Sequence, residues 1–209
     1  LPLDAFVIGM AAMNQGRKNL PGTIEAFKRF AVDKPKALLY LDMDVISGGG
    51  WDLEALRREM GIPDGKIFYR SPGLPAGNVA APFCIGDRLP EFRERFWLMD
   101  VHGVLAYREG FGLPLIEGMA CRLPTFALDW CSGTEIVSDG RGLLVRRQPE
   151  MRYGTWGLAQ DADPDVDDLV QQLNELYYWP EKRAYMADKG RAWAVARTWD
   201  KRRMQWRLC

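Results

Sequence analysis

The sequence has no excess of charge of either sign, no long hydrophobic run and no leader pattern. Its 28 basic residues are balanced by 28 acidic ones, so the overall charge gives no reason to expect nucleic-acid binding. The longest apolar runs, such as residues 37–41, are far shorter than the ~20 residues that a membrane helix needs. No signal-peptide pattern follows Leu1. These absences predict a cytoplasmic protein without a nucleic-acid partner.

Residues that bind metals or form disulfides are also scarce. The four cysteines form no C-x-x-C pair, and the only histidine is His102. A zinc site would need clustered Cys and His ligands, so no metal site is predicted. We expect reduced thiols, as is usual in a cytoplasmic compartment. His102 lies among apolar residues, which favours a packed strand histidine over a catalytic one.

The sequence does contain an alternation of strand and helix patterns with the composition of a globular domain. Strands are predicted at 5–9, 36–42, 66–69, 101–107, 125–128 and 142–146. Helices are predicted at 20–30, 51–60, 89–99, 114–121, 165–178 and 181–196, and irregular segments at 71–87 and 147–164. This order indicates an α/β fold, a Rossmann-like parallel sheet with helices on both faces. We expect a single domain over residues 1–209, including the C-terminal helices at 165–207.

Two polar turns follow strands of this predicted sheet, at residues 10–19 and 108–113. Ligands of such sheets bind outside the carboxyl ends of the strands, so we expect the two turns to share one crevice. The first turn carries Arg17 and Lys18. An Arg-Lys pair is often only solvated, but at this edge it suits the oxygens of a diphosphate.

The second turn suits an anion. Gly110 and Gly112 let the backbone approach a ligand closely, and a helix begins at Leu113 or Pro114. Its free N–H groups and positive dipole end form a natural phosphate site. We place Glu117 in the first turn of that helix, where it either complements the helix dipole or accepts hydrogen bonds from paired hydroxyls. Spacing alone leaves both interpretations open.

The run from Glu109 to Glu117, followed by residues 119–121 and Pro124, closely resembles the donor-binding half of family 4 glycosyltransferases of the GT-B fold. The two glutamates match the E-x7-E motif of that family. E-x7-E alone is a weak signal, but here it lies within a longer string that covers nearly the whole chain. Further matches at the expected spacing are Gly16-Arg17-Lys18-Asn19, Trp51-Asp52-Leu53, Asp100-Val101-His102, Gly133-Thr134-Glu135 and Trp199.

The resemblance implies a nucleotide-diphosphate sugar as donor substrate, with no other cofactor, no metal and retention of anomeric configuration. Glu117 would hold the ribose hydroxyls, and Glu109 would orient the donor sugar. Lys18, with Arg17 beside it, would stabilise the charge on the leaving group. The diphosphate would meet the backbone of Gly110, Phe111, Gly112 and Leu113. Asp42-Met43-Asp44 imitates an Asp-x-Asp metal motif, and we interpret it as the end of the second strand.

The chain departs from the family pattern at three places. Met10 stands where the family usually has an arginine, and Asn14 or Arg17 is a candidate to compensate for the lost charge. Arg122 stands where a left-handed glycine cap is usual, which costs on the order of 1 kcal/mol. The acceptor-binding first domain is absent from the sequence. We therefore expect part of a longer enzyme, or a chain that works with a separate acceptor-binding domain or a second copy of itself.

Two further interpretations remain. The first is a non-catalytic nucleotide-sugar-binding module. The second is a dinucleotide dehydrogenase, but this would need a G-x-G-x-x-G turn, which residues 9–14 do not supply. The C-terminal strip of Trp193, Trp199 and Trp206, interleaved with basic residues, is interpreted as a docking surface or as a peripheral contact with an anionic membrane. Base recognition is expected near residues 69–73.

Overall fold

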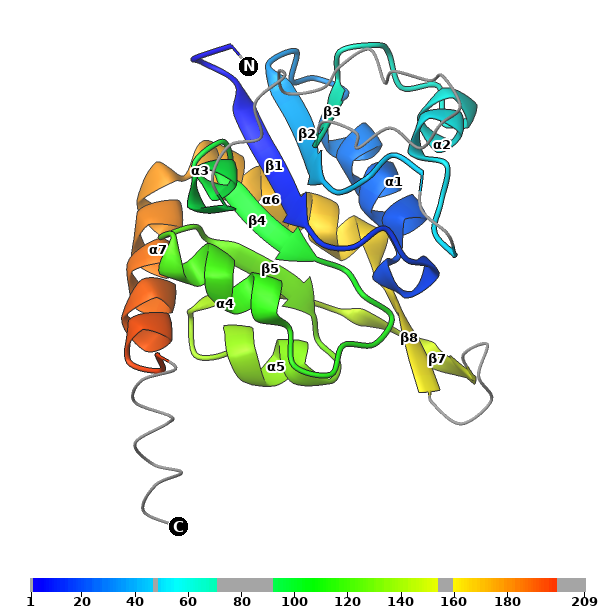
Figure 1. Cartoon of the computed structure of the whole chain (residues 1–209). Coiled ribbons are helices and arrows are strands. Elements are labelled where there is room, and N and C mark those ends of the chain that lie inside the picture. The colour runs from blue at the N-terminus through cyan, green and yellow to red at the C-terminus, as the bar shows by residue number, and fades with distance from the viewer. Residues whose placement is uncertain (1, 47–48, 71–91, 154–159, 199–209) are drawn as a thin grey trace.

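The chain folds around one parallel sheet with an antiparallel hairpin at its edge (Figure 1). The computed structural model describes residues 2–46, 49–70, 92–153 and 160–198. The sheet strands lie in the order β3 (Ile67–Tyr69), β2 (Ala37–Asp42), β1 (Phe6–Ala11), β4 (Val101–Val104), β5 (Thr125–Leu128) and β6 (Gly142–Val145). All five neighbouring pairs are parallel. The strand order reverses between β1 and β4, and ligands of such sheets bind at that point.

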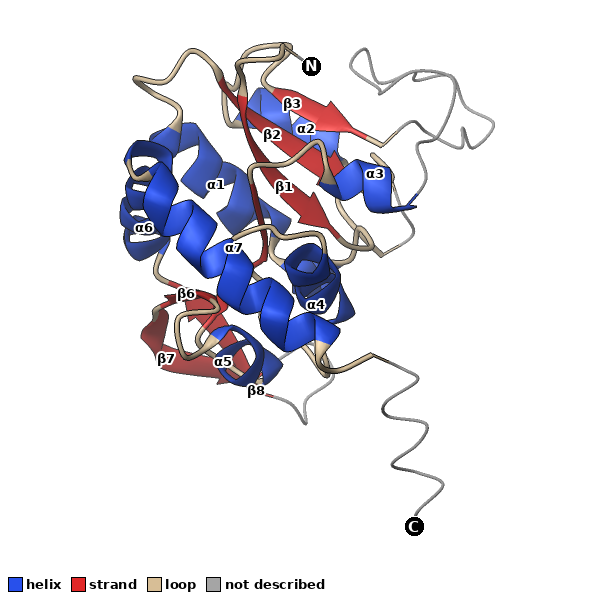
Figure 2. Cartoon of the chain, turned by 90° about the vertical axis from the view of Figure 1, so that its left-hand side faces the viewer, coloured by secondary structure: helices blue, strands red, loops and turns tan. Residues whose placement is uncertain are grey.

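Helices cover both faces of the sheet, as predicted. The helices are α1 (Leu20–Phe30), α2 (Leu53–Glu59), α3 (Phe92–Phe96), α4 (Leu113–Ala120), α5 (Ser132–Val137), α6 (Val166–Tyr178) and α7 (Pro180–Val195). Helices α1 and α6 pack together on one face, whereas α3 and α4 lie on the other (Figure 1). Helix α7 packs across α4 (Figure 2). None of the helices in the described part of the chain is long and apolar enough to cross a membrane.

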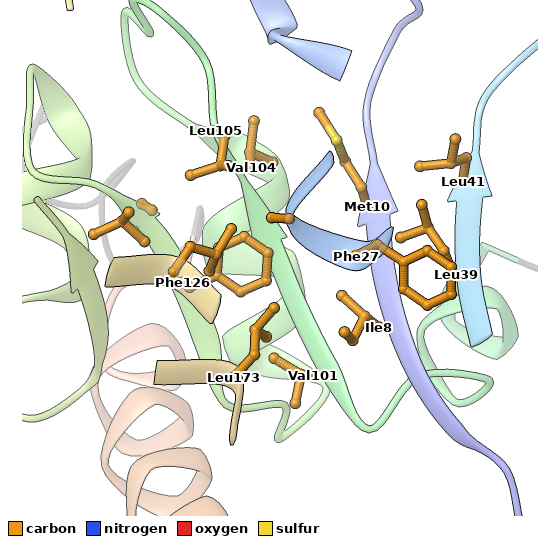
Figure 3. Close-up of a cluster of buried hydrophobic side chains, with 14 of the residues drawn as sticks. Ile8, Met10, Phe27, Leu39, Leu41, Val101, Val104, Leu105, Phe126 and Leu173 are labelled. Atoms are coloured by element: carbon orange, nitrogen blue, oxygen red, sulfur yellow. The ribbon is translucent and has the colours of Figure 1, made fainter. Parts of the chain in front are cut away.

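The central strands form because their residues are apolar on both sides. Every residue of β1 and β2 is buried, which is the pattern of parallel strands that lie between two helix layers. Ile8 and Met10 point to the α1 side, where they meet Phe27, Leu39 and neighbouring apolar side chains (Figure 3). Met10 is fully buried. The methionine that replaces a family arginine is therefore a core residue of this chain.

Local signals set the helix ends that border the site. The Asn19 side chain accepts a hydrogen bond from the backbone N–H of Gly22 at 3.1 Å, and α1 begins there. Gly112 precedes α4 with a φ of 82°, a conformation that favours glycine. Arg122 ends the same segment with a φ of 63°, which confirms the left-handed cap that its family position implied. Its guanidinium pairs with Asp188 at 2.6 Å on the surface.

The structure corrects several boundaries. Residues 147–164 were predicted to be irregular, but they contain the antiparallel strands β7 (Arg147–Tyr153) and β8 (Gln160–Pro164). Strand β7 is mostly exposed, so it carries no apolar alternation that would have revealed it. Helix α5 was also missed, because its six residues are too few to show a helical period. The strand predicted at 101–107 ends at Val104, and residues 105–107 already belong to the loop.

Candidate functional site

The two predicted turns meet at one edge of the sheet. The first forms a short 3-10 helix, η1 (Gly16–Lys18), and the second is the loop between β4 and α4. The Lys18 ammonium donates a hydrogen bond to Oε2 of Glu109, and Nη1 of Arg17 bonds to the same oxygen at 3.1 Å. This contact joins residues that are 91 and 92 positions apart in the sequence. It confirms that the two turns share one crevice.

Burial and charge act in opposite directions on this cluster. The Lys18 side chain is only 5% exposed and that of Glu109 18%. Burial lowers the pKa of Lys18, and the bond to Glu109 offsets only part of that effect. Burial disfavours a charge on Glu109 as well, but the bonds to Lys18 and Arg17 outweigh it and hold the pKa of this carboxyl below its usual value. Glu109 is thus an ionised group at neutral pH.

Only one oxygen of Glu109 is used by these cations. Both bonds end on Oε2, so within the described part of the chain Oε1 has no bonded partner. A carboxylate oxygen that is fixed in place and unbonded is a suitable acceptor for a ligand hydroxyl. The arrangement therefore combines a held carboxylate with two cations at the sheet edge.

Three hydrogen bonds from two neighbouring elements fix the backbone of the β4–α4 loop. The N–H of Tyr107 donates to the carbonyl of Arg17 at 2.9 Å, and Nη1 of Arg17 donates to the carbonyl of Arg108 at 3.4 Å. The Ser132 hydroxyl of α5 donates to the carbonyl of Glu109 at 3.1 Å. Bonds from η1 and α5 therefore hold Glu109 in position.

The start of α4 presents backbone N–H groups at the same edge. The first residues of a helix have no intrahelical acceptor for their N–H groups, and here Phe111 and Leu113 are 57% and 45% exposed. A Cβ atom at Gly112 would lie 3.1 Å from Leu115 and 3.2 Å from Ile136, so a side chain there would crowd the turn. The loop at 110–113 thus has the glycine, the exposure and the helix end that an anion site requires.

Glu117 lies in a different environment. It is the fifth residue of α4 and belongs to the second helical turn, so its predicted place in the first turn was wrong. A helix dipole acts mainly within the first turn, which weakens the purely electrostatic interpretation of this residue. The carboxyl is half-buried, and burial raises its pKa above the usual value. Among the described residues it has no hydrogen-bond or ion-pair partner.

Two hollows flank this segment. One, of about 740 Å³, lies in front of Glu109, and we call it the hairpin hollow. Its walls include Arg17, Arg108, Glu109, Trp130, Tyr153 and Gln160. The other, of about 680 Å³, is a mainly apolar groove between α4, α5 and the end of α7, with Glu117 on its wall. Sequence reasoning missed Arg108, Trp130, Tyr153 and Gln160, because no motif marks them and the hairpin was not predicted.

Asn14 does not supply the charge that Met10 lacks. It is 2% exposed, and its amide nitrogen donates to the carbonyls of Asp44 and Trp51 at 3.0 and 2.7 Å. Its amide oxygen accepts from the N–H of Trp51 at 2.9 Å. Asn14 therefore ties the loop after β1 to the loop after β2. Of the two candidates for compensation, only Arg17 lies at the crevice.

Other candidate residues have structural roles. His102 is fully buried in β4, its Nε2 accepts from the N–H of Ala11 at 3.3 Å, and burial lowers its pKa to about 3, so it is a neutral packed histidine. Asp42 ends β2, as predicted, and pairs with Arg95 at 3.4 Å. The described ranges contain no group of three or more residues arranged to hold a metal ion.

The expected base site at residues 69–73 and the C-terminal tryptophan strip lie only partly within the described residues. Tyr69 is buried and its hydroxyl lies 3.5 Å from the carbonyl of Leu53, so its side chain does not face a base. Residues 71–73, the rest of the expected base site, are not described. Trp199 and Trp206 of the C-terminal strip are likewise outside the described ranges. The guanidinium groups of Arg141 and Arg197 lie 5.0 and 4.1 Å from the centre of the Trp193 ring.

Comparison with known proteins gives one family. Residues 85–193 match the family described as glycosyl transferases group 1. The D-inositol 3-phosphate glycosyltransferase of Stackebrandtia nassauensis is 34% identical over 169 residues, which are 77% of this chain and 34% of that protein. The GDP-mannose-dependent alpha-(1-6)-phosphatidylinositol monomannoside mannosyltransferase of Mycolicibacterium smegmatis is 30% identical over 155 residues, 72% of this chain and 34% of that protein. The chain thus spans about a third of the length of these relatives.

Solved structures share the fold. The C-terminal domain of a glycosyl transferase group 1 family protein from Francisella tularensis superposes with a TM-score of 0.66 at 20% identity, covering 92% of this chain and 85% of that one. Anabaena HepE, solved in complex with UDP and glucose, gives a TM-score of 0.66 at 18% identity and covers 92% of this chain and 44% of that one. The fold of this chain is that of the C-terminal half of a GT-B protein.

Proposed function

Because the chain belongs to the glycosyl transferases group 1 family, we propose that it is the nucleotide-sugar-binding domain of a retaining glycosyltransferase. Its substrate would be a nucleotide-diphosphate hexose, from which the hexose passes to an acceptor hydroxyl. The observation that carries the proposal is the cluster of Glu109, Lys18 and Arg17 beside the start of α4 at the strand-order switch. The complex of Anabaena HepE with UDP and glucose supports it by likeness of fold.

Each site residue has a role that follows from its surroundings. Lys18 is a buried cation, and a buried positive charge stabilises the negative charge that develops on a departing diphosphate more strongly than a solvated one. Arg17 is 36% exposed and adds a second positive charge at the rim. Glu109 offers Oε1 to a hydroxyl of the donor sugar. The half-buried carboxylate of Glu117 is without a protein partner among the described residues and accepts from the ribose hydroxyls.

The proposal does not require a metal. Two cationic side chains and the N–H groups of residues 111–113 provide positive charge for the diphosphate, which is the task that a divalent ion performs in other transferases. The donor substrate is accordingly the only small molecule proposed for this site, with no separate cofactor.

The acceptor site needs more than this domain. GT-B enzymes have two such domains with the reaction between them, and this chain corresponds to about a third of the length of its relatives. We propose that the acceptor is held by an N-terminal domain of the same protein, by a separate partner or by a second copy. The two relatives named above act on a phosphorylated inositol and on a phosphatidylinositol mannoside, so a polyol acceptor at a cytoplasmic membrane surface is the proposed class.

The second candidate function is a binding module that performs no transfer. One observation favours it. Met10 is buried in the core, so the position where the family usually has an arginine offers no positive charge to a phosphate. Such a module would bind the same nucleotide sugar without releasing the hexose.

The test is a calorimetric titration of the chain with UDP, GDP and ADP and their common hexose conjugates, with Glu117→Ala beside the wild type. We expect selective binding of one nucleotide and an affinity at least about tenfold weaker in the variant, since a hydrogen bond to a charged group contributes about 1.5–3 kcal/mol. Absence of binding to every member of the panel would overturn the proposal. Slow release of free hexose from the bound donor would separate the enzyme from the binding module.

A further inference from the structure

The hairpin β7–β8 packs against the loop that carries the site. The N–H of Ala162 in β8 donates to the carbonyl of Tyr107 at 3.2 Å. The Arg152 guanidinium of β7 lies 4.2 Å from the centre of the Tyr107 ring, and it pairs with Asp163 of β8 at 2.9 Å. Figure 1 shows the hairpin projecting at the edge where β1 and β4 end. It therefore forms a wall of the crevice that holds Glu109.

A buried ion pair fixes this wall to the residue next to Glu109. Arg108 pairs with Asp161 of β8, whose side chain is 7% exposed. Among the described residues Arg108 uses only Nη1 for this bond, so its other N–H groups are available at the hollow. The pair thus orients a set of planar donors beside the carboxylate of Glu109.

Aromatic side chains provide the apolar part of the lining of the hollow. Trp130, which follows β5, has its indole N–H buried, so the part of its side chain that lines the hollow is hydrocarbon. The Arg147 guanidinium lies 5.5 Å from the centre of the Trp130 ring and helps to hold it. Tyr153 lies at the hairpin rim and is 73% exposed. The hollow therefore combines two aromatic surfaces with Arg108, Glu109 and Gln160 as hydrogen-bonding groups.

We propose that the hairpin hollow is a subsite for a hydroxylated six-membered ring, with Trp130 and Tyr153 against its C–H face and Arg108 and Gln160 at its hydroxyls. Such a ring has apolar faces and a polar edge, and this hollow offers the complement of both. A volume of about 740 Å³ is within the range of roughly 300–1,000 Å³ that small-molecule sites occupy. The proposal rests on the proposed function in one respect, because the ring belongs either to the donor sugar or to the acceptor.

The experiment compares Tyr153→Ala and Trp130→Ala with Tyr185→Ala, a control on α7 that replaces a tyrosine of similar exposure (58%) outside the hollow. Calorimetry measures the affinities for UDP, UDP-glucose, GDP and GDP-mannose. Saturation-transfer NMR measures binding of methyl α-glucoside, methyl α-mannoside and myo-inositol, with and without the nucleotide sugar. Tyr153 is on the surface, so its variant tests the proposal even if the Trp130 variant does not fold.

If the ring is that of the donor, the nucleotide sugar loses about five- to tenfold in affinity in Tyr153→Ala, whereas the nucleoside diphosphate loses none. If it is that of the acceptor, the free rings give saturation-transfer signals in the presence of the nucleotide sugar, and Tyr153→Ala weakens these signals. Equal behaviour of Tyr153→Ala and Tyr185→Ala in both measurements would overturn the subsite. Binding of the free rings without binding of any nucleotide would overturn the proposed function and leave the subsite standing.

Discussion

The two glutamates of one loop–helix segment are eight residues apart, and they lie in opposite surroundings. Glu109 is bound by Lys18 and Arg17, and those cations hold its pKa below the usual value. Glu117 is half-buried on the wall of the groove between α4, α5 and the end of α7, without an ionic partner among the described residues, and burial raises its pKa. The surroundings of Glu109 thus stabilise its charged form, whereas those of Glu117 disfavour the charged form of the same side chain.

The two carboxylates therefore differ in how far the protein itself positions them for a ligand. At Glu109 the protein itself supplies the counter-charges, so the carboxylate is positioned before a ligand arrives. At Glu117 the carboxylate has lost part of its hydration without gaining a protein donor, which favours a ligand that brings hydroxyl donors. We therefore expect Glu109 to contribute to stability as well as to binding, and Glu117 to contribute to binding alone.

We expect the largest effect on affinity from removing Lys18, the cation that pairs with Glu109 and that we propose contacts the diphosphate. Lys18→Met should weaken binding of the preferred nucleotide sugar by about 10- to 100-fold, because a charge-assisted bond in a buried site contributes about 1.5–3 kcal/mol. Calorimetry on the wild type and the variant measures this loss. Lys34→Met is the matched control, since Lys34 is equally buried and paired with Asp33, away from the crevice. Equal losses in both variants would contradict the role of Lys18.

The same substitution, Glu to Gln, should have different effects on stability at the two positions. Glu109→Gln leaves the buried Lys18 without its counter-ion and should lower the free energy of unfolding by about 1–3 kcal/mol. Glu117→Gln should change it by less than about 0.5 kcal/mol, because no protein contact among the described residues is lost. Thermal unfolding of the ligand-free chain measures both. A destabilisation by Glu117→Gln as large as that by Glu109→Gln would show an ionic partner at Glu117.

The smallest expected effect is a dependence of binding on pH. Since burial raises the pKa of Glu117, this carboxyl takes up a proton at a higher pH than an ordinary glutamate. It then loses its negative charge, and one of its two oxygens becomes a donor, so it accepts more weakly from hydroxyls. Affinity for the nucleotide sugar should fall by a few-fold on acidification, over a pH range that lies above the ordinary glutamate pKa of 4.5. Titrations across this range measure the fall, and Glu117→Gln should abolish it. A fall that persists in that variant would assign the titration to another group.

Glu109 behaves differently under the same acidification. Because its folded pKa is depressed, it contributes stability at pH values above its unfolded pKa, and this contribution is lost only as the pH falls through the lower folded value. The stability that Glu109 contributes is therefore lost at a lower pH than the binding that depends on Glu117. The two glutamates can in this way be followed separately in one series of measurements.

Much of the architecture followed from the sequence. Alternating apolar strands and amphipathic helices predicted the parallel sheet, and the rule that ligands bind at the carboxyl ends of strands brought residues 10–19 and 108–113 to one crevice. The contact of Lys18 with Glu109 bears this out. The left-handed conformation of Arg122 also followed from its position after α4. These features depend on local patterns and on general rules of sheet topology, which one sequence is enough to reveal.

The remaining features depended on contacts between distant residues. The hairpin β7–β8 escaped prediction because its strands are stabilised by pairing with each other and by contacts to Tyr107 and Arg108, none of which leaves a periodic pattern. Asn14 was a candidate for the phosphate, but the loop after β2 occupies its amide. Which polar groups are free for a ligand is decided by which ones the fold has already satisfied.

Local patterns of the sequence were enough to predict the fold class, the edge of the sheet that carries the site and the two glutamates of the E-x7-E motif. Strand and helix periodicity and turn chemistry are local properties of the chain. Three-dimensional contacts were needed to show that Glu109 is paired, that Glu117 has no partner among the described residues, that Met10 is a core residue and that a hairpin walls the crevice. Burial and charge pairing are properties of three-dimensional surroundings, and residues about ninety positions apart create those surroundings here.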